Sequence, residues 1–220
     1  MNPTPTPSMP AASPPGAADR PILVWDAPVR VFHWLLAGSF LGAFVTDLEL
    51  EPDVPQEDQC GTCVDCIPAC PTGAIVAPYV VDARRCLSYQ SIEQPEAWPE
   101  EIVADSEGWV HGCDVCQDVC PWSKKFATQS TEADFAPRSR VMGRGLSSYI
   151  GLAETDWDAL TEGSPLRREG RAGLVRNALA AAAVVAGDPG TDAAVAAAEE
   201  AADPVVRAQA VLARKRRGRG

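Results

Sequence analysis

Eight cysteines in two runs constrain this chain more than any other feature of its sequence. They are Cys60, Cys63, Cys66 and Cys70, followed by Pro71, and Cys86, Cys113, Cys116 and Cys120, followed by Pro121. The first run has the spacing C-x2-C-x2-C-x3-C-P, in which the thiolates are ligands of 4Fe-4S clusters. Because each cluster takes four thiolates, the eight cysteines predict a protein that binds two 4Fe-4S clusters and transfers electrons.

The spacing also predicts which thiolates share a cluster. In bacterial chains with this spacing, the fourth cysteine of a run ligates the other cluster. We therefore assign Cys60, Cys63, Cys66 and Cys120 to the first cluster, and Cys86, Cys113, Cys116 and Cys70 to the second. The second run is unusual because 26 residues separate Cys86 from Cys113. A small unit interlocked by two clusters has little core of its own, so we expect removal of the iron to unfold it.

Disulfide bonds and zinc are the two alternatives for these cysteines. Disulfide scaffolds are short secreted chains, and residues 1–19 lack the basic start and apolar run of a signal peptide. Zinc sites pair two C-x2-C units, whereas here a third cysteine and a Cys-Pro step follow. Thiolates that ligate iron are sensitive to oxidation, so we expect a reducing compartment and a cytoplasmic protein.

Charge is distributed unevenly along the chain, whose net charge is −11. Residues 1–165 carry 9 basic and 24 acidic residues, net −15, whereas residues 166–220 carry 10 basic and 6 acidic residues, net +4. A polyanion binds through lysine and arginine. Only the C-terminal part is therefore suited to such a partner.

The N-terminal region contains two segments of different character. Residues 1–19 are rich in Pro, Ala, Ser and Thr, and we predict that they are disordered. Residues 22–47 are predicted to form an isolated apolar helix, whose 15-residue core, 31–45, is shorter than the roughly 20 residues that span a bilayer. A tilted span, an interfacial helix and a buried helix all remain open, and residues 31–45 are a candidate membrane contact.

The same segment, residues 22–46, resembles the first helix of bacterial and hydrogenase-linked b-type membrane cytochromes. Residues 24–34 read VWDAPVRVFHW, and the family pattern is V-W-D-x-P-x-R-x-x-H-W. The resemblance implies that His33 is a candidate haem ligand. We do not expect haem b, because a bis-histidine site needs a second ligand from another membrane helix. The only other histidine, His111, lies beside the cysteine motif.

Residues 58–220 resemble epoxyqueuosine reductase. The matching motifs are residues 60–75, 82–89, 112–117 and 120–122, which hold the cysteines, together with residues 131–138, 164–168 and 170–178. The displaced first cysteine of the second run, Cys86, is part of this match.

The resemblance implies an iron–sulfur oxidoreductase of queuosine biosynthesis, which reduces epoxyqueuosine in tRNA. In that family two 4Fe-4S clusters pass electrons to a cobalamin, an N-terminal domain holds the cobalamin, and a C-terminal helical module helps to hold the tRNA. This chain matches the cluster and helical parts only, so we expect the cobalamin domain to be absent and assign no catalytic residue. The expected partners are tRNA and an electron donor such as a flavodoxin or ferredoxin.

The C-terminal region shows a weak internal repeat, which places Arg176 and Arg207 31 residues apart. This period predicts a HEAT-like helical repeat with helices near residues 171–186, 191–202 and 204–216. Asp203 and Pro204 are predicted to begin the last helix. The arginines predicted to contact tRNA are Arg84, Arg85, Arg167, Arg168, Arg171, Arg176 and Arg207.

Together these patterns predict an α+β chain that is mostly helical and irregular. A ferredoxin-like double 4Fe-4S domain at residues 55–140 is expected to precede a HEAT-like module with a basic tail at residues 141–220. Two other functions remain open: a membrane-associated ferredoxin-like electron-transfer protein, and an inactive chimeric fragment.

Overall fold

The computed structural model of the chain describes residues 27–46, 53–55, 60–132, 135–136, 138 and 140–218. The chain forms two compact units, one of residues 1–59 and 132–136, the other of residues 60–131 and 137–220. The disorder predicted for residues 1–19 concerns a segment outside the described residues. The prediction of a mostly helical fold is confirmed, since a single two-stranded sheet accompanies the helices of the described chain.

In the described residues of the first unit, helix α1 (Ala27–Val45) is longer than the 15-residue apolar run from which it was predicted. Its 19 residues include none that is buried. The side-chain hydroxyl of Ser39 donates to the carbonyl of Leu35, at 2.7 Å, so this polar group is satisfied within the helix. Among the described residues, α1 is the helix long and apolar enough to cross a membrane.

The second unit begins with a cysteine-rich part, residues 60–131, which we call the cluster lobe. Its elements are short: α2 (Cys66–Ala69), β1 (Ile75–Ala77), β2 (Val80–Val81), η1 (Ala83–Arg85), α3 (Leu87–Ile92), α4 (Glu100–Ala104), α5 (Val115–Val119) and α6 (Pro121–Phe126). Cys70 and Cys120 each precede a proline and are extended, with ψ of 114° and 121°. A residue before proline avoids the helical region, so α2 and α5 both end at a cysteine.

Strands β1 and β2 pair antiparallel, with Ile75 opposite Val81 and Ala77 opposite Val80. The turn between them places Tyr79 at φ 62°, a left-handed conformation that favours glycine. Tyr79 is 70% exposed, so little burial offsets this backbone strain.

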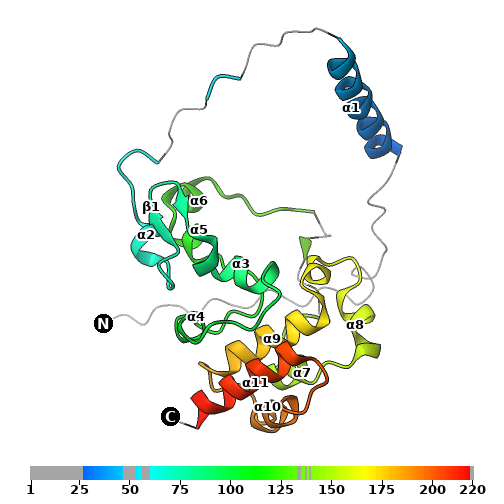
Figure 1. The fold of residues 1–220 in the computed structure, drawn as a ribbon. Helices are drawn as coiled ribbons and strands as arrows, with labels where there is room; N and C mark the ends of the chain where they lie inside the picture. The colour runs from blue at the N-terminus through cyan, green and yellow to red at the C-terminus, as the bar shows by residue number, and fades with distance from the viewer. Residues whose placement is uncertain are drawn as a thin grey trace. The chain divides into compact units, whose positions relative to one another are not determined.

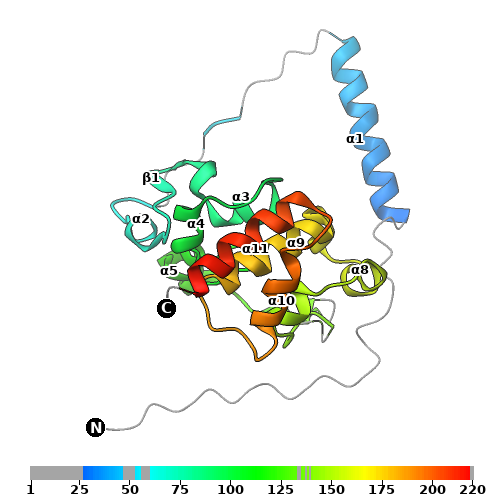
Figure 2. The same cartoon turned by 60° about the horizontal axis from the view of Figure 1, so that its bottom comes forward.

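The C-terminal part, residues 140–218, consists of helices around a central one. The elements are α7 (Leu146–Ile150), α8 (Glu154–Thr161), η3 (Pro165–Arg168), α9 (Gly170–Ala182), α10 (Thr191–Ala198) and α11 (Pro204–Arg217). In Figures 1 and 2, α9 lies alongside α11 in the interior of this part. Residues 174–182 of α9 are all buried, because its alanines let α3, α7 and α11 approach on several sides.

The predicted start of the last helix is confirmed. The carboxylate of Asp203 accepts hydrogen bonds from the backbone N–H groups of Val205, at 2.8 Å, and Val206, at 3.1 Å. Pro204 occupies the first turn, where its missing N–H costs no hydrogen bond. The HEAT-like relation between α9, α10 and α11 stays a prediction.

The cluster lobe and the C-terminal helices share a core. Leu87 of α3, Trp98, and Ile102 and Val103 of α4 are buried against Ala180 of α9. The backbone N–H of Trp98 donates to Oε1 of Gln209 on α11, at 2.7 Å. Figure 2 shows α3 and α4 beside α9 and α11. The cysteine-bearing segments are therefore attached to a packed helical body rather than to a flexible linker.

Candidate iron–sulfur centres

All eight cysteines lie in loops or at the ends of short helices of the cluster lobe. Cys60 and Cys63 are exposed, and the other six are half-buried. Helices α2 and α5, one from each run, lie in contact with one another. The fold therefore brings the two runs, which are far apart in the sequence, onto neighbouring elements.

Thiols from both runs lie close enough to influence one another. Burial raises the pKa of the Cys113 thiol, and the negative charges of Cys116, Cys86 and Cys70 raise it further. A cation beside such thiols deprotonates them and removes this repulsion. The pKa of Cys116 is likewise raised by burial and by the charges of Cys86 and Cys66, so Cys66 and Cys70 of the first run both lie near cysteines of the second.

The loop after Cys70 directs polar groups at its sulfur. The backbone N–H of Ala74 donates to Sγ of Cys70, at 3.2 Å. Although burial raises the pKa of this thiol, hydrogen bonds from the backbones of Ile75, Ala74 and Thr72 and from the Thr72 hydroxyl lower it by more. The net pKa lies below the ordinary value, so these hydrogen bonds stabilise the thiolate relative to the thiol.

Gly73 allows the loop after Cys70 to approach Arg85 closely. It has φ +58°, and a Cβ there would lie 3.1 Å from Nη2 of Arg85. The hydroxyl of Thr72 also donates to the carbonyl of Arg85, at 2.6 Å, and so ties the loop to the residue before Cys86. A larger residue at Gly73 would strain the backbone and press on the Arg85 side chain.

Cys120 directly precedes α6, and the first residues of this helix lower the pKa of its thiol, as the loop after Cys70 does for that cysteine. Hydrogen bonds from the backbone of Ser123, and then of Trp122, lower the pKa of its thiol. Backbone N–H groups that donate to cluster sulfurs stabilise the negative charge of a bound cluster and tune its potential. The described cysteines therefore fit the ligand chemistry of iron–sulfur clusters.

Within the described residues, no three His, Cys, Asp or Glu side chains converge as the ligands of one metal ion do. A 4Fe-4S cluster makes a different demand on its ligands, because each of its four thiolates binds a different iron.

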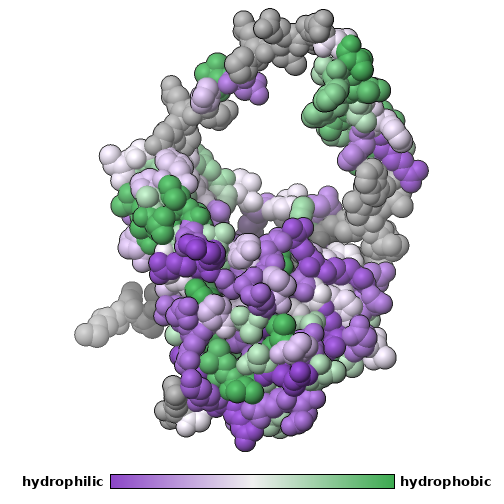
Figure 3. Space-filling view, viewed as in Figure 1, coloured by the Kyte–Doolittle hydropathy of each residue, from purple (hydrophilic) through white to green (hydrophobic). Residues whose placement is uncertain are grey.

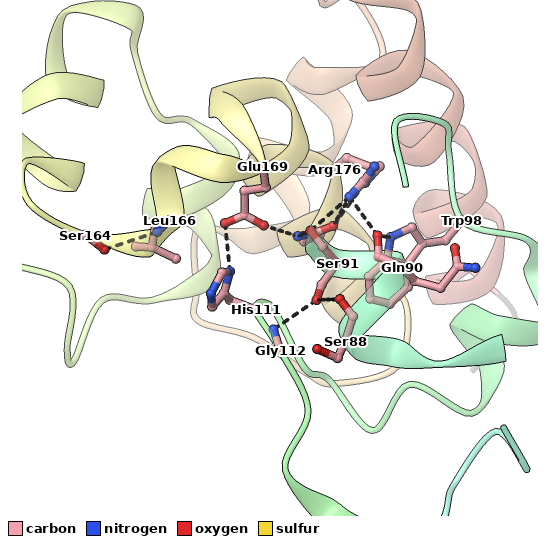
Figure 4. A network of polar contacts seen from close by, with 11 residues as sticks. Ser88, Gln90, Ser91, Trp98, His111, Gly112, Ser164, Leu166, Glu169 and Arg176 are labelled. Atoms are coloured by element: carbon pink, nitrogen blue, oxygen red, sulfur yellow. Dashed lines mark hydrogen bonds and ion pairs between the residues drawn. The ribbon is translucent and has the colours of Figure 1, made fainter. Parts of the chain in front are cut away.

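A polar network holds the loop before Cys113 (Figure 4). The hydroxyl of Ser91 on α3 accepts a hydrogen bond from the backbone N–H of Gly112, at 2.9 Å. The imidazole of His111 lies 3.1 Å from a carboxylate oxygen of Glu169. Burial raises the pKa of Glu169, while His111 opposes this shift. The C-terminal helices thus fix the position of a predicted cluster ligand.

Arg176 is the centre of this network, and its predicted contact with tRNA is wrong. The residue is 1% exposed. Its guanidinium donates to the carbonyl of Gln90, at 3.0 Å, to the carbonyl of Ser91, at 3.3 Å, and to that of Gln94. Burial lowers its pKa to about 10. A guanidinium committed to buried carbonyls has no donor left for an RNA phosphate.

The other arginines predicted to contact tRNA lie at the surface, most of them in ion pairs. Arg84 pairs with Asp82 at 2.9 Å, Arg167 with Asp158 at 2.6 Å, Arg168 with Glu93 at 2.6 Å and Arg171 with Glu154 at 2.5 Å. Arg85 is exposed, and Arg207 donates to the carbonyls of Ala201 and Ala202, each at 2.7 Å. The side chain of Arg84 is 86% exposed, so its ion pair leaves it accessible to a polyanion.

The basic tail is likewise paired in the structure. Arg214 contacts Glu199, Lys215 lies 3.1 Å from Glu100, and Arg217 lies 2.6 Å from Asp192. Arg217 also donates to carbonyls at the end of α9. These contacts attach α11 to its neighbours and reduce the positive charge that the sequence places there.

His33 lies on α1, in the unit that does not contain the cysteines. Its Nδ1 lies 2.9 Å from the carbonyl of Val29. Its role as a haem ligand stays a prediction.

Comparison with known proteins shows what the cysteine region is similar to. The model of the 4Fe-4S double cluster binding domain matches residues 59–123. An epoxyqueuosine reductase of Synechocystis sp. is 45% identical over 142 residues, which are 64% of this chain and 49% of that protein. The epoxyqueuosine reductase of Escherichia coli K12 is 42% identical over 162 residues, which are 73% of this chain and 42% of that protein.

Solved structures give the same result. The epoxyqueuosine reductase of Bacillus subtilis has a TM-score of 0.62 and 30% identity, over 74% of this chain and 44% of that one. An epoxyqueuosine reductase crystallised with an epoxyqueuosine-modified tRNA-Tyr stem loop has a TM-score of 0.63 and 29% identity, over 76% and 44%. The chain spans less than half of each of these four relatives. Through its cluster lobe and C-terminal helices, the chain is similar to the epoxyqueuosine reductases.

Proposed function

We propose that this chain is the iron–sulfur electron-transfer part of an epoxyqueuosine reductase, which acts in the conversion of epoxyqueuosine to queuosine in tRNA. The observation that carries the proposal is the contact of α2 with α5, which brings together the two cysteine runs of a region that matches the double cluster binding domain. The similarity to epoxyqueuosine reductases over 64% of the chain supports the same activity. A cytoplasmic location and a ferredoxin-like cluster domain followed by HEAT-like helices belong to this proposal.

The proposed ligands follow the crossed pattern. Cys86, Cys113, Cys116 and Cys70 hold one 4Fe-4S cluster, and Cys60, Cys63, Cys66 and Cys120 hold the other. Hydrogen bonds to the sulfurs of Cys70 and Cys120 favour the thiolate in one member of each set. When bound, the clusters supply one-electron storage, and the protein supplies the thiolates, the backbone donors and the attachment to the helical core.

The involvement of cobalamin is inferred only from the resemblance to epoxyqueuosine reductase. A depression of about 120 Å³ on α6 is smaller than the 300–1,000 Å³ typical of ligand sites, so it does not fit such a cofactor. No described residue is assigned to cobalamin. The proposed role of this chain therefore ends with delivery of electrons to a domain that holds the cofactor.

The tRNA is proposed to contact the exposed arginines rather than the buried one. Arg84 of η1 is 86% exposed and Arg168 of η3 is 67% exposed in their side chains. Arg84 lies two residues before Cys86, which places phosphate binding close to the clusters. Exchange of an exposed ion pair for a phosphate contact is easy, because such pairs contribute little to stability.

Expression of the full chain in a bacterium that lacks its own epoxyqueuosine reductase tests the activity. The chain is supplied alone and together with the cobalamin-binding part of a relative, and tRNA hydrolysates are analysed by mass spectrometry. We expect queuosine when the chain is supplied alone or with the cobalamin-binding part. The matched variant is Cys116→Ala, which lacks one cluster ligand. Unchanged epoxyqueuosine in both arms, with clusters loaded, would contradict the proposal.

A membrane-associated electron carrier is the second candidate, and α1 is the observation that favours it. A helix of 19 residues is about 28 Å long, close to the roughly 30 Å hydrocarbon thickness of a bilayer. Its apolar residues face all directions, and none is buried, so an apolar environment is needed to cover it.

The two candidate functions place the cluster lobe on opposite sides of a membrane. Arg20 and Arg30 lie at the N-terminal side of α1, and no lysine or arginine occurs from there to Arg84. By the positive-inside rule, a spanning α1 would leave the residues after it outside the cytoplasm, away from tRNA. Protease digestion of intact and opened spheroplasts distinguishes them. Protection of the cluster lobe in intact spheroplasts supports the tRNA enzyme, and cleavage there supports the carrier.

A further inference from the structure

α6 presents an exposed aromatic pair directly after a proposed cluster ligand. The rings of Trp122 and Phe126 stack with centroids 4.9 Å apart and planes inclined by 25°. The two side chains are 43% and 55% exposed. Together with Pro121 and Lys125 they line the depression of about 120 Å³. Exposed stacked rings of this kind gain burial when another molecule covers them.

More apolar surface lies on the same lobe. Val64, Val76, Val80 and Val81 are each about half exposed, between 48% and 55%. Helix α2 contacts both α5 and β1, and α5 contacts α6, so these elements form a continuous body. Figure 3 shows a hydrophobic patch over the part of the lobe where Figure 1 labels α2 and β1.

The charge beside the ring pair is opposite to that of the lobe. Residues 60–131 contain 4 basic and 10 acidic residues, net −6. Two of the four basic residues, Lys124 and Lys125, lie on α6, and both are exposed. Nζ of Lys125 lies 5.1 Å from the centroid of the Phe126 ring. An acidic partner therefore finds an apolar contact and positive charge together on α6.

We propose that the α6 face, formed by Pro121, Trp122, Lys124, Lys125 and Phe126, is the docking site of an acidic, low-potential one-electron carrier protein. The inference rests on the proposed ligation of a cluster by Cys120. In the step, the reduced carrier loses one electron and the cluster gains it, and no covalent bond forms or breaks. The small apolar centre with basic residues beside it has the character of transient electron-transfer interfaces.

The connection between this face and the cluster is short. Trp122 is the second residue after Cys120, in the first turn of the helix that follows this cysteine. A carrier seated on the ring pair is thus joined to the ligand through two peptide units. The other basic residues of the lobe, Arg84 and Arg85, lie on η1, away from α6 in the sequence, and Arg84 is paired with Asp82.

RNA is the less favoured occupant of this face. A nucleic acid carries charge along its whole length and gains affinity from many phosphate contacts. Two lysines in a lobe of net charge −6 offer few of them. A folded carrier touches only a local surface, because charges more than about 8 Å away are screened at physiological salt.

Stopped-flow spectroscopy of the full chain with both clusters loaded tests the proposal. Reduced flavodoxin is the probe, and the bleaching of cluster absorption gives the second-order rate. In the double variant K124E/K125E we expect the rate at low salt to fall by about tenfold or more, and the difference to shrink as salt rises. The matched control is R144E/K215E, which reverses the same charge at two exposed residues of the C-terminal part and is expected to keep the rate. Photoreduced deazariboflavin, a small neutral reductant, should reduce all three proteins equally.

An unchanged flavodoxin rate in K124E/K125E would overturn the proposal, as would an equal loss in R144E/K215E. If K124E/K125E keeps its rate but loses salt-sensitive binding to a tRNA anticodon stem loop, the face is an RNA contact and the proposal is also overturned. Queuosine formation is read separately by mass spectrometry. A slow K124E/K125E in a chain that forms no queuosine would leave the docking site standing while the proposed enzyme function fails.

Discussion

Arg176 of α9 donates a hydrogen bond of 3.0 Å to the carbonyl oxygen of Gln90 on α3. Gln90 in turn donates from its side chain to the carbonyl of Arg84, at 2.5 Å, two residues before Cys86. A residue of the C-terminal helices is thereby linked to the segment that carries a proposed cluster ligand. The contact gives a buried arginine a structural role in a helix otherwise rich in alanine.

Replacement of Arg176 by Met should destabilise the protein by about 3 kcal/mol or more, because it removes donors from several buried carbonyls and the charge near Glu169. Thermal unfolding followed by circular dichroism measures this effect. The control is Arg168→Ala, whose ion pair with Glu93 is exposed and should contribute at most about 1 kcal/mol. Equal melting temperatures for wild type and R176M would contradict the structural role.

The crossed assignment of ligands predicts which fourth cysteine is no longer needed for iron binding once the other three ligands of its cluster are removed. In a variant with Cys86, Cys113 and Cys116 all replaced by Ala, one cluster should remain. Further replacement of Cys70 should leave the iron content unchanged, whereas replacement of Cys120 should abolish it. Iron analysis of the reconstituted variants measures this difference. The reverse result, loss with Cys70 and none with Cys120, would show that each run holds its own cluster.

Removal of iron should loosen the cluster lobe and spare the C-terminal core. The core around Leu174, Val175 and Leu179 includes no cysteine, so its packing does not depend on the clusters. Hydrogen exchange after anaerobic chelation should show lost protection in residues 60–81 and 111–126, with α9 and α11 still protected. Uniform loss of protection, including α9, would contradict the independence of this core.

Asp188 should make the stability of the protein depend on pH in the acidic range. Hydrogen bonds from the side chain and backbone of Ser147 hold its pKa at about 2, below the ordinary 3.8. Its contribution is therefore complete above pH 3.8 and lost as the pH falls towards 2. Asp188→Asn should lower the melting temperature at pH 7, and its difference from wild type should shrink in this acid range. A difference that stays constant down to pH 2 would contradict the assignment.

Gly145 offers an independent check of the same contact. A Cβ at this position would overlap the carboxylate of Asp188. Gly145→Ala should therefore lower the melting temperature at pH 7 and should add little to the effect of Asp188→Asn, because both changes break one contact. Fully additive effects would show that the two residues act separately.

The sequence predicted those features that depend on local chemistry. The Asp203-Pro204 start of α11 follows from capping rules, and the cysteine spacing indicated the double cluster domain that the family comparison supports. Arg176 was misassigned because an arginine in a helix is usually exposed, whereas the alanines of α9 allow neighbours on several sides. The docking face on α6 could not be predicted, because the stacking of Trp122 on Phe126 and the position of Lys125 beside them depend on the fold. Residue spacing along the chain does not show whether these rings are exposed.

Iron and acid-labile sulfide, measured on the full chain after anaerobic reconstitution, test the central claim most directly. Two 4Fe-4S clusters predict about eight irons and about eight sulfides per chain, with Cys116→Ala reduced to about half of each. One or two metal ions without sulfide, or a full complement in Cys116→Ala, would contradict the account.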